Sequence, residues 1–357
     1  YNLSINKNLN WLGLANWIPM FWLYFCAQFY LKDNKARRLC ALLLTLGTIP
    51  ILISGFGQYY FEWHGPFQLL KGTIIWYQRG NDEGFQTLTG PFNNANVAGT
   101  WLTTIFPFSI FYIINSSKRI SKRIFYILLT LATLLATFLT HSRNALINTS
   151  IASLLMLGVS LKILFICLIA IFLLCASIFI FEIPLDFLNL FKKSGFLSSF
   201  IPETSKLSDF LNFYRIKIWR TTIFNIFKSP FIGWGASSFS TLYLLKYGND
   251  YSKSGFQHTH NLVLELANNY GIFVSLIVFT TIFFLIYKSK PNISSNRLNE
   301  DLIDKFWWIS TLIILLMHMS DIAYYDGRIS ILFWILMAGI RCILRESSLK
   351  NSIKKDY

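Results

Sequence analysis

The sequence has few charged residues, and acidic residues are the scarcest of them. Charged residues are 14% of the 357 positions, with 17 acidic against 32 basic side chains, whereas hydrophobic residues are 54% and aromatic residues 17%. A soluble globular domain has about 25% charged residues. The composition therefore excludes an ordinary soluble domain and indicates a polytopic membrane protein.

The sequence also lacks the patterns that hold common cofactors. Its five cysteines lie in or beside apolar runs without a Cys-x-x-Cys pair, which argues against a disulfide framework or a zinc site. It has no glycine-rich phosphate loop, no His-Glu-x-x-His and no aspartate-rich cluster, so we expect neither a cofactor nor a metal. The chain begins at Tyr1 without a signal peptide pattern, and we expect a truncated N-terminus with further spans upstream.

Long apolar runs are what the sequence has instead. A membrane-crossing helix needs about 20 mostly apolar residues, and nine runs approach this length. Gly158 and Lys162 place a tight turn between the fifth and sixth of them. The sequence predicts an all-α fold, a polytopic membrane helical bundle of about nine transmembrane helices that forms a single membrane domain over residues 1–357. The predicted spans are 11–31, 39–57, 97–114, 124–140, 144–160, 163–181, 261–287, 306–323 and 329–344.

The basic residues predict how this bundle is oriented. More than half of the 32 fall on one side if the spans alternate, and basic loops mark the cytoplasmic side. Membrane orientation therefore explains the +15 net charge better than nucleic-acid binding does. The basic segments are 32–38, 115–123, 288–305 and the tail from Arg341. The other, periplasmic side receives 58–96, the turn 141–143, the long loop 182–260 and the turn 324–328.

The long loop 182–260 contains a candidate interfacial helix. Apolar residues recur at helical spacing between Leu207 and Phe227, which predicts an amphipathic helix over 205–228 at the membrane surface. The segment Pro230–Gly235 then breaks this helix. Earlier in the chain, the asparagines of segment 90–96 are expected to cap the predicted span 97–114.

The stretch 257–271 stands where the long loop ends and an apolar run begins. His258 and His260 sit at this junction, and four polar residues follow on one face of a helix. A polar stripe that leads into a span should face a cavity or the bundle interior, because contact with lipid is costly. We interpret the stretch as the rim of an active site. The four residues are Asn261, Glu265, Asn268 and Asn269.

Three basic side chains are expected to meet on the periplasmic side. Arg143 ends a span, Arg215 lies in the amphipathic helix, and His260 opens the next span. Two guanidinium groups hold phosphate oxygens in a bidentate way and would form a diphosphate clamp. A neutral histidine beside them could take a proton from an attacking hydroxyl.

Each of these residues also has a simpler explanation that the sequence leaves open. Arg143 could anchor its helix among lipid headgroups, and Arg215 could contact headgroups from an interfacial helix. His260 could be an ordinary first residue of a helix bonded to the loop, and His258 could lie in solvent.

Other polar residues are candidates for supporting roles. Glu265 could orient the nearby histidine or bind sugar hydroxyls, and Asp326 and Arg328 could line the same cavity from the outer turn. We expect His318 and Asp321, three residues apart in a span, to pair with each other because ionisable groups are costly in lipid. Secondary candidates for donor contact are His141, Lys217 and Arg220.

Over roughly residues 90–345 the chain resembles the O-antigen ligase and polymerase superfamily. The best match is His260, followed directly by Asn261 and, after ten intervening residues, by Gly271; this spacing resembles the ligase histidine motif. The other matches are Ser142-Arg143 at the end of an earlier span, the segment from Arg215 to Trp219, and Pro230 with Gly233-Trp234-Gly235 in the long loop.

The resemblance implies a metal-independent, inverting glycosyltransferase of the bacterial inner membrane, with its active site facing the periplasm. Its donor would be a glycan on undecaprenyl diphosphate and its acceptor a hydroxyl such as one of the lipid A core, with membrane lipids around both. Arg143 and Arg215 would bind the donor diphosphate, and His260 would activate the acceptor. Substrate contacts are expected from Asn261, Glu265, His258, Arg220, Lys217 and Arg328, and structural glycines at Gly271, Gly233 and Gly235.

Two rival functions stay open at this point. A polymerase that joins repeat units on the same carrier would carry the same motifs. An inorganic-anion transporter would instead show broken helices in pairs and charges near the bilayer midplane. The charges singled out above cluster at the outer ends of the spans, which favours surface chemistry over transport.

Overall fold

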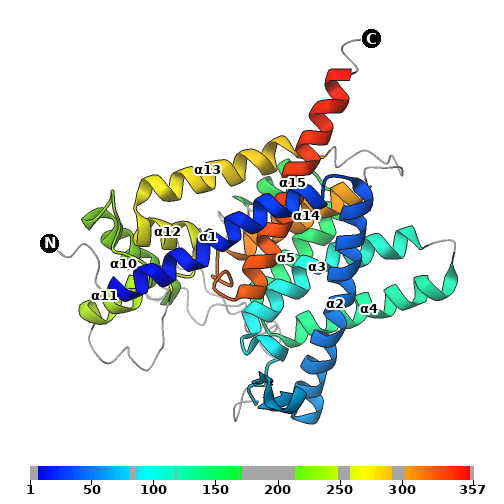
Figure 1. Cartoon of the computed structure of the whole chain (residues 1–357), viewed down its shortest axis with the longest axis horizontal. Coiled ribbons are helices and arrows are strands. Elements are labelled where there is room, and N and C mark those ends of the chain that lie inside the picture. The colour runs from blue at the N-terminus through cyan, green and yellow to red at the C-terminus, as the bar shows by residue number, and fades with distance from the viewer. Residues whose placement is uncertain are drawn as a thin grey trace.

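The structure is a computed structural model, and it describes residues 7–80, 86–116, 119–167, 169–170, 214–247, 258–291 and 302–353. Within these ranges the regular elements are helices, apart from a two-stranded antiparallel hairpin in which Phe67 pairs with Trp76. Figure 1 shows the arrangement of the helices, and the elements also include two 3₁₀ turns, η1 and η2. In chain order they are α1 (Lys7–Tyr30), α2 (Asn34–Phe61), β1 (Phe67–Leu69), η1 (Leu70–Gly72), β2 (Ile74–Trp76), η2 (Gly90–Phe92), α3 (Ala95–Asn115), α4 (Ile120–Leu139), α5 (Arg143–Met156), α10 (Tyr214–Lys228), α11 (Ser238–Tyr247), α12 (Leu262–Tyr270), α13 (Ile272–Lys288), α14 (Leu302–Met317) and α15 (Gly327–Ile353).

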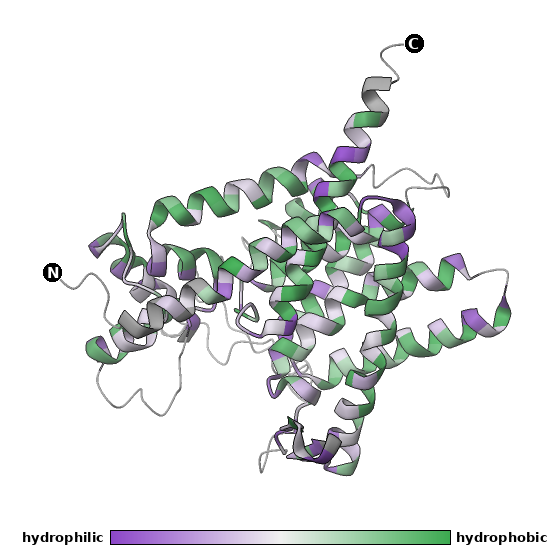
Figure 2. Cartoon of the chain, viewed as in Figure 1, coloured by the Kyte–Doolittle hydropathy of each residue, from purple (hydrophilic) through white to green (hydrophobic). Residues whose placement is uncertain are grey.

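Four helices of the described part are long and apolar enough to cross a membrane. Hydrophobic residues run along α2, α4 and α13, while hydrophilic residues gather where α1 turns into α2 (Figure 2). The predicted all-helical membrane fold is therefore confirmed, but the count of nine spans is not. The run 163–181 lies mostly outside the described residues, as do residues 205–213 of the expected amphipathic helix and much of loop 182–260. The four helices are Asn34–Phe61, Ala95–Asn115, Ile120–Leu139 and Gly327–Leu349.

Two predicted spans differ from the helices that form. The run 261–287 is two helices, α12 and α13, because Gly271 between them has a φ of +90° that a continuing helix cannot contain. The run 306–323 is helical only as far as Met317, the last residue of α14, and turns follow up to α15. The asparagine cap is confirmed, since the side chain of Asn94 accepts hydrogen bonds from the first backbone N–H groups of α3.

Helix α14 lies at the centre of the bundle, in contact with α3, α5 and α15. Its Trp307 is fully buried and donates a hydrogen bond to the carbonyl of Leu336 in α15, at 2.9 Å. Gly339 makes this approach possible, because a Cβ there would lie 2.3 Å from the indole. The ring of Trp307 also packs against Phe108 of α3, with ring centroids 5.5 Å apart. This layer of aromatic residues fixes α14 between its neighbours.

The basic segments meet at one end of this bundle. The guanidinium of Arg37 is fully buried and binds Asp304 at 2.8 Å and Glu346 at 2.7 Å, which joins the starts of α2 and α14 to the end of α15. The Tyr112 hydroxyl, near the end of α3, donates to the carbonyl of Arg38. Arg37 was counted with the orienting charges, but the structure gives it two carboxylate partners in the protein interior. The other end of α14, 16 residues away, lies about 24 Å from this cluster.

Candidate active site

The segment that follows α14 holds together the N-termini of two helices. The Asn144 amide of α5 donates to the carbonyl of Met317 at 3.0 Å. The Asn261 amide, which caps α12, donates to the carbonyl of Met319 at 2.8 Å. The two acceptors, Met317 and Met319, are only two residues apart. Arg143 precedes Asn144 and His260 precedes Asn261, so Arg143 and His260 lie at the same end of the bundle. This is the end opposite the Arg37 cluster.

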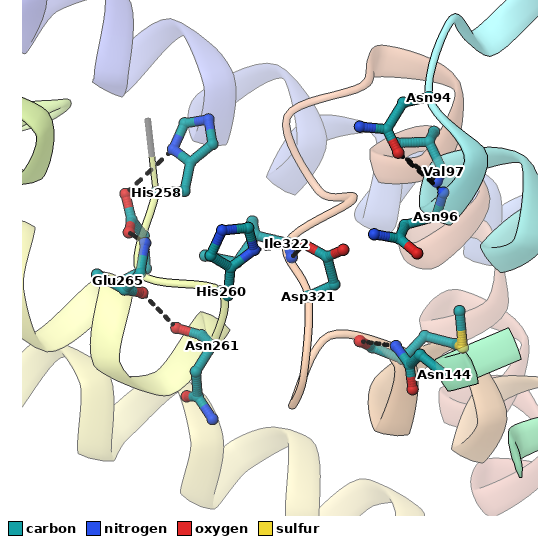
Figure 3. A network of polar contacts seen from close by, with 12 residues as sticks. Asn94, Asn96, Val97, Asn144, His258, His260, Asn261, Glu265, Asp321 and Ile322 are labelled. Atoms are coloured by element: carbon teal, nitrogen blue, oxygen red, sulfur yellow. Dashed lines mark hydrogen bonds and ion pairs between the residues drawn. The ribbon is translucent and has the colours of Figure 1, made fainter. Parts of the chain in front are cut away.

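The side chains of His260 and Asp321 form a hydrogen bond at this point. The Nδ1 atom of His260 lies 2.8 Å from Oδ1 of Asp321, which also accepts a hydrogen bond from the backbone of Ile322 at 2.8 Å (Figure 3). An ionised carboxylate can only accept, so Nδ1 carries the hydrogen and Nε2 is left as the acceptor in a neutral ring. His260 itself adopts a φ of +55°, which is uncommon for a residue with a side chain.

The expected pairing of His318 with Asp321 is wrong. The Nδ1 atom of the buried His318 lies 2.6 Å from the carbonyl of Ile314, within its own helical turn. Because α14 ends at Met317, Asp321 is not held on the same helix face and turns toward α12 instead. Sequence reasoning thus missed the partner of His260. The signal that could have found it was an acidic residue beside the outer end of an apolar run.

The charge of Asp321 is stabilised by its surroundings. Burial raises the pKa of this carboxyl, but the hydrogen bond and charge of His260, together with the charge of Arg215, outweigh burial and hold the pKa below its ordinary value. Asp321 is therefore an anion at neutral pH. Arg215 of α10 is thus a second charged residue that acts on this carboxyl.

Helix α10 is tied to the histidine segment one turn after Arg215. The indole N–H of Trp219 donates to the carbonyl of Thr259 at 3.0 Å, so α10 contacts the residue that precedes His260. Arg215 and Trp219 are four residues apart and share one face of the helix. The fully buried Ile218 packs α10 against α11. These contacts place Arg215 on the side of α10 that faces the site.

Glu265 anchors the same segment from inside. Its carboxylate, 1% exposed, accepts hydrogen bonds from the Thr259 backbone at 3.0 Å, the Asn269 amide at 3.0 Å and the Tyr325 hydroxyl at 3.2 Å. Burial raises its pKa, but His258 and the backbone of Thr259 outweigh burial and lower it. Of the two roles expected for Glu265, positioning fits this geometry, whereas direct contact with sugar hydroxyls does not.

His258 is held in place rather than exposed to solvent. Its ring stacks on Tyr325 with centroids 4.4 Å apart. Its Nδ1 lies 3.6 Å from the Glu265 carboxylate (Figure 3). The side chain is 27% exposed. His258 and His260 therefore each face a carboxylate, and only one residue separates them.

The three glycines of the motif lie where two backbones touch. A Cβ on Gly271 would be 2.1 Å from the carbonyl oxygen of Phe231, and one on Gly233 would be 2.6 Å from the backbone of Asn269. The backbone N–H of Gly235 donates to the Asn269 carbonyl at 3.0 Å. All three glycines have positive φ. The segment after α10 thus packs directly against the end of α12, which needs residues without side chains.

The remaining candidates lie around this centre. Arg143 is exposed at the first position of α5, next to Ser142, whose hydroxyl donates to Asn96 of α3 at 2.7 Å. Arg328 is exposed, binds Asp326 at 2.9 Å and lies over the ring of Phe92 at 4.2 Å. Three further candidates lie on helices or turns of the same end: Lys217 over the ring of Tyr247 at 4.5 Å, Arg220 on the exposed face of α10, and His141, exposed before α5. Among the described residues, no group of His, Cys, Asp or Glu could hold a metal ion.

The described helices thus place a histidine–carboxylate pair and an arginine at one end of the bundle. Residues 128–279 match the family model of O-antigen ligase, from within α4 to within α13. This match agrees with the resemblance that the sequence motifs predicted, and it indicates a membrane glycosyltransferase of the ligase or polymerase type. No curated protein matches the chain. Arg143, Arg215 and His260 fall inside the matched range, and Asp321 lies beyond it.

Proposed function

We propose that the protein transfers a glycan from an undecaprenyl diphosphate carrier to a hydroxyl group of an acceptor glycan such as the lipid A core. The observation that carries this proposal is the contact between His260 and Asp321 at 2.8 Å, with the charge of Arg215 acting on the same carboxylate. A base, its orienting anion and a guanidinium are the groups that such a transfer requires.

His260 is the general base in this mechanism. Asp321 holds the proton on Nδ1, so that Nε2 accepts the proton of the acceptor hydroxyl while its oxygen attacks the anomeric carbon. The new glycosidic bond forms as the bond from that carbon to the diphosphate breaks, and the electron pair leaves with the diphosphate. Attack from the face opposite the leaving group inverts the anomeric configuration. Asp321 then stabilises the imidazolium by its negative charge.

The leaving diphosphate is stabilised by positive groups. Arg215 and Arg143 supply guanidinium forks that fit phosphate oxygens. Three helices begin at this end, with Asn94 capping α3, Ser142 capping α5 and Asn261 capping α12. Each helix N-terminus carries about half a positive charge. The contacts Ser142–Asn96, Asn144–Met317 and Asn261–Met319 keep the three N-termini together, which favours binding of an anion here.

The side of the membrane follows from the opposite end of the bundle. The basic segment 32–38 and the basic tail from Arg341 lie at that end, where the positive-inside rule puts the cytoplasm. The His260 end then faces the periplasm, where polyprenyl-linked glycans are presented. The location supports a carrier-lipid donor over a nucleotide sugar.

The test is glycan profiling in cells that carry His260→Ala, Arg215→Ala or the parent chain as the sole copy. We expect both variants to accumulate at parental levels in the membrane while glycan attachment to the acceptor is lost. Unchanged attachment would overturn the assignment. Accumulation of long chains on the carrier identifies a ligase, whereas accumulation of single repeat units identifies a polymerase. Uptake of a labelled anion by proteoliposomes, abolished by the same variants, would identify a transporter.

A further inference from the structure

The outward face of α10 carries several exposed apolar side chains beside Arg220, and it is not packed against the described part of the protein. Ile218, Thr222, Asn225 and Ile226 are buried, while Phe227 is 74% exposed on the opposite face. An exposed row of large apolar side chains is unfavourable in water and marks a surface that contacts lipid or a partner. The other exposed apolar residues of this face are Ile223 and Phe224.

This apolar face continues onto the outer surface of α13. The exposed Phe231, just after α10, stacks on Phe273 in the first turn of α13, with ring centroids 5.7 Å apart. The exposed Phe273, Ile277 and Phe284 follow along α13, which is an apolar helix of 17 residues. The face of α10 therefore extends a lipid-facing helix surface at the end of the bundle where the candidate site lies.

Two lysines flank the same aromatic ring on this face. The ammonium groups of Lys228 and Lys246, from α10 and α11, each lie 4.6 Å from the centroid of Phe224. None of the ion pairs among the described residues involves either lysine. The two ammonium groups are like charges near one ring, so an anion between them would offset their repulsion. Lipid phosphates supply such anions at a membrane interface.

We propose that this surface is a phospholipid-binding patch of the periplasmic leaflet, in which Lys228 and Lys246 bind the phosphate of an anionic phospholipid above Phe224. We define the interfacial patch as Ile223, Phe224, Phe227, Lys228, Phe231 and Lys246. Its apolar residues enter the boundary between headgroups and acyl chains, and its lysines extend to the phosphate level. The patch fixes the depth of α10 in the membrane. If the proposed function holds, it also fixes the height of Arg215 relative to the carrier diphosphate.

The first test measures lipid retention and does not depend on glycan transfer. The full chain is placed in nanodiscs of phosphatidylcholine and phosphatidylglycerol, and retained lipids are counted by native mass spectrometry. We expect the double variant Lys228→Gln/Lys246→Gln to lose one phosphatidylglycerol that the parent retains. The control Lys71→Gln, an exposed lysine on the hairpin, should lose none. Equal retention by the double variant, or displacement of this lipid by undecaprenyl diphosphate, would overturn the proposal.

A second measurement addresses the depth of the patch. In a chain whose five native cysteines are replaced by alanine, Phe227→Cys carries a nitroxide label in phosphatidylglycerol-containing vesicles. We expect the label to be relaxed strongly by oxygen and weakly by a water-soluble nickel complex. The reverse order would show that the patch lies in water. Because both readouts are independent of catalysis, failure of the patch and failure of the proposed glycosyl transfer are distinguishable.

Discussion

His260 and Asp321 are 61 residues apart in the sequence, and their side chains meet at 2.8 Å between Nδ1 and Oδ1. The contact joins the start of α12 to the turn between α14 and α15. Histidine alone provides a base, but a carboxylate on Nδ1 decides which nitrogen is free to accept the proton. Five predictions follow from this contact and from the segments that support it.

Asp321→Asn should lower the rate of glycan transfer by between about 10²- and 10⁴-fold, the range that a general base and its orientation contribute. The amide preserves the size of the side chain but removes the charge that orients the imidazole. The measurement is single-turnover transfer in proteoliposomes. Asp33→Asn is the matched control, because Asp33 caps α2 at the other end of the bundle and asparagine caps equally well. A rate for Asp321→Asn near that of this control would refute the role of Asp321.

The stability contributed by Asp321 should depend on pH. Its native pKa lies below the ordinary value, so the ionised group stabilises the folded state. This contribution is fully present above the unfolded pKa of about 4 and disappears as the pH falls through the lower native pKa. Thermal unfolding of the parent and of Asp321→Asn in detergent should therefore differ most at neutral pH and converge in acid. A difference that grows as the pH falls would contradict the sign of the shift.

Trp219→Phe should weaken transfer several-fold while the chain stays folded. The substitution keeps the aromatic packing of α10 but removes the indole N–H that donates to Thr259 at 3.0 Å. One such hydrogen bond contributes about 1 kcal/mol, enough to loosen Arg215 relative to His260. Trp234→Phe is the control, because its indole donates at 2.8 Å to Asn225 within the α10 region. Equal transfer rates for the two variants would show that the Trp219 hydrogen bond does not position α10 at the site.

Gly271→Ala should sharply reduce the yield of folded protein. The new Cβ would lie 2.1 Å from the Phe231 carbonyl oxygen, and the φ of +90° is strained for alanine. The segment after α10 must then move away from α12. Gly47→Ala, in α2, is the matched control because a Cβ there meets nothing within 4 Å. Monodisperse yield by fluorescence-detected size exclusion is the measurement, and equal yields would show that the close approach is dispensable.

Glu265→Ala should destabilise the fold by roughly 3 kcal/mol or more, because a buried donor left without a partner costs about 1–3 kcal/mol. The Thr259 backbone, the Asn269 amide and the Tyr325 hydroxyl would all lose their acceptor. Glu265→Gln keeps one acceptor oxygen and should fall between the alanine variant and the parent. Glu62→Ala removes an exposed carboxylate and serves as the control. An unfolding temperature for Glu265→Ala equal to that of Glu62→Ala would exclude the anchoring role.

The sequence by itself determined that the fold is helical, although the run 261–287 forms two helices and the run 306–323 ends early as a helix. Apolar runs near the length of a bilayer form helices, because the backbone polar groups must be hydrogen-bonded within the span. The basic loops between the runs indicate which end of each span faces the cytoplasm. The residues of the ligase histidine motif could also be found from the sequence, because His260 and Gly271 lie in one continuous segment. Arg143 and Arg215 were placed with them by the alternation of spans.

Only the tertiary structure decided which side chains meet. The partner of His260 is Asp321 rather than His318, because α14 ends at Met317 and the following turns leave the helix register on which the predicted pairing depended. Arg37 is buried against two carboxylates far along the chain. Contacts between residues tens or hundreds of positions apart depend on how helices pack, and hydrophobic periodicity specifies which face is buried without specifying what lies against it.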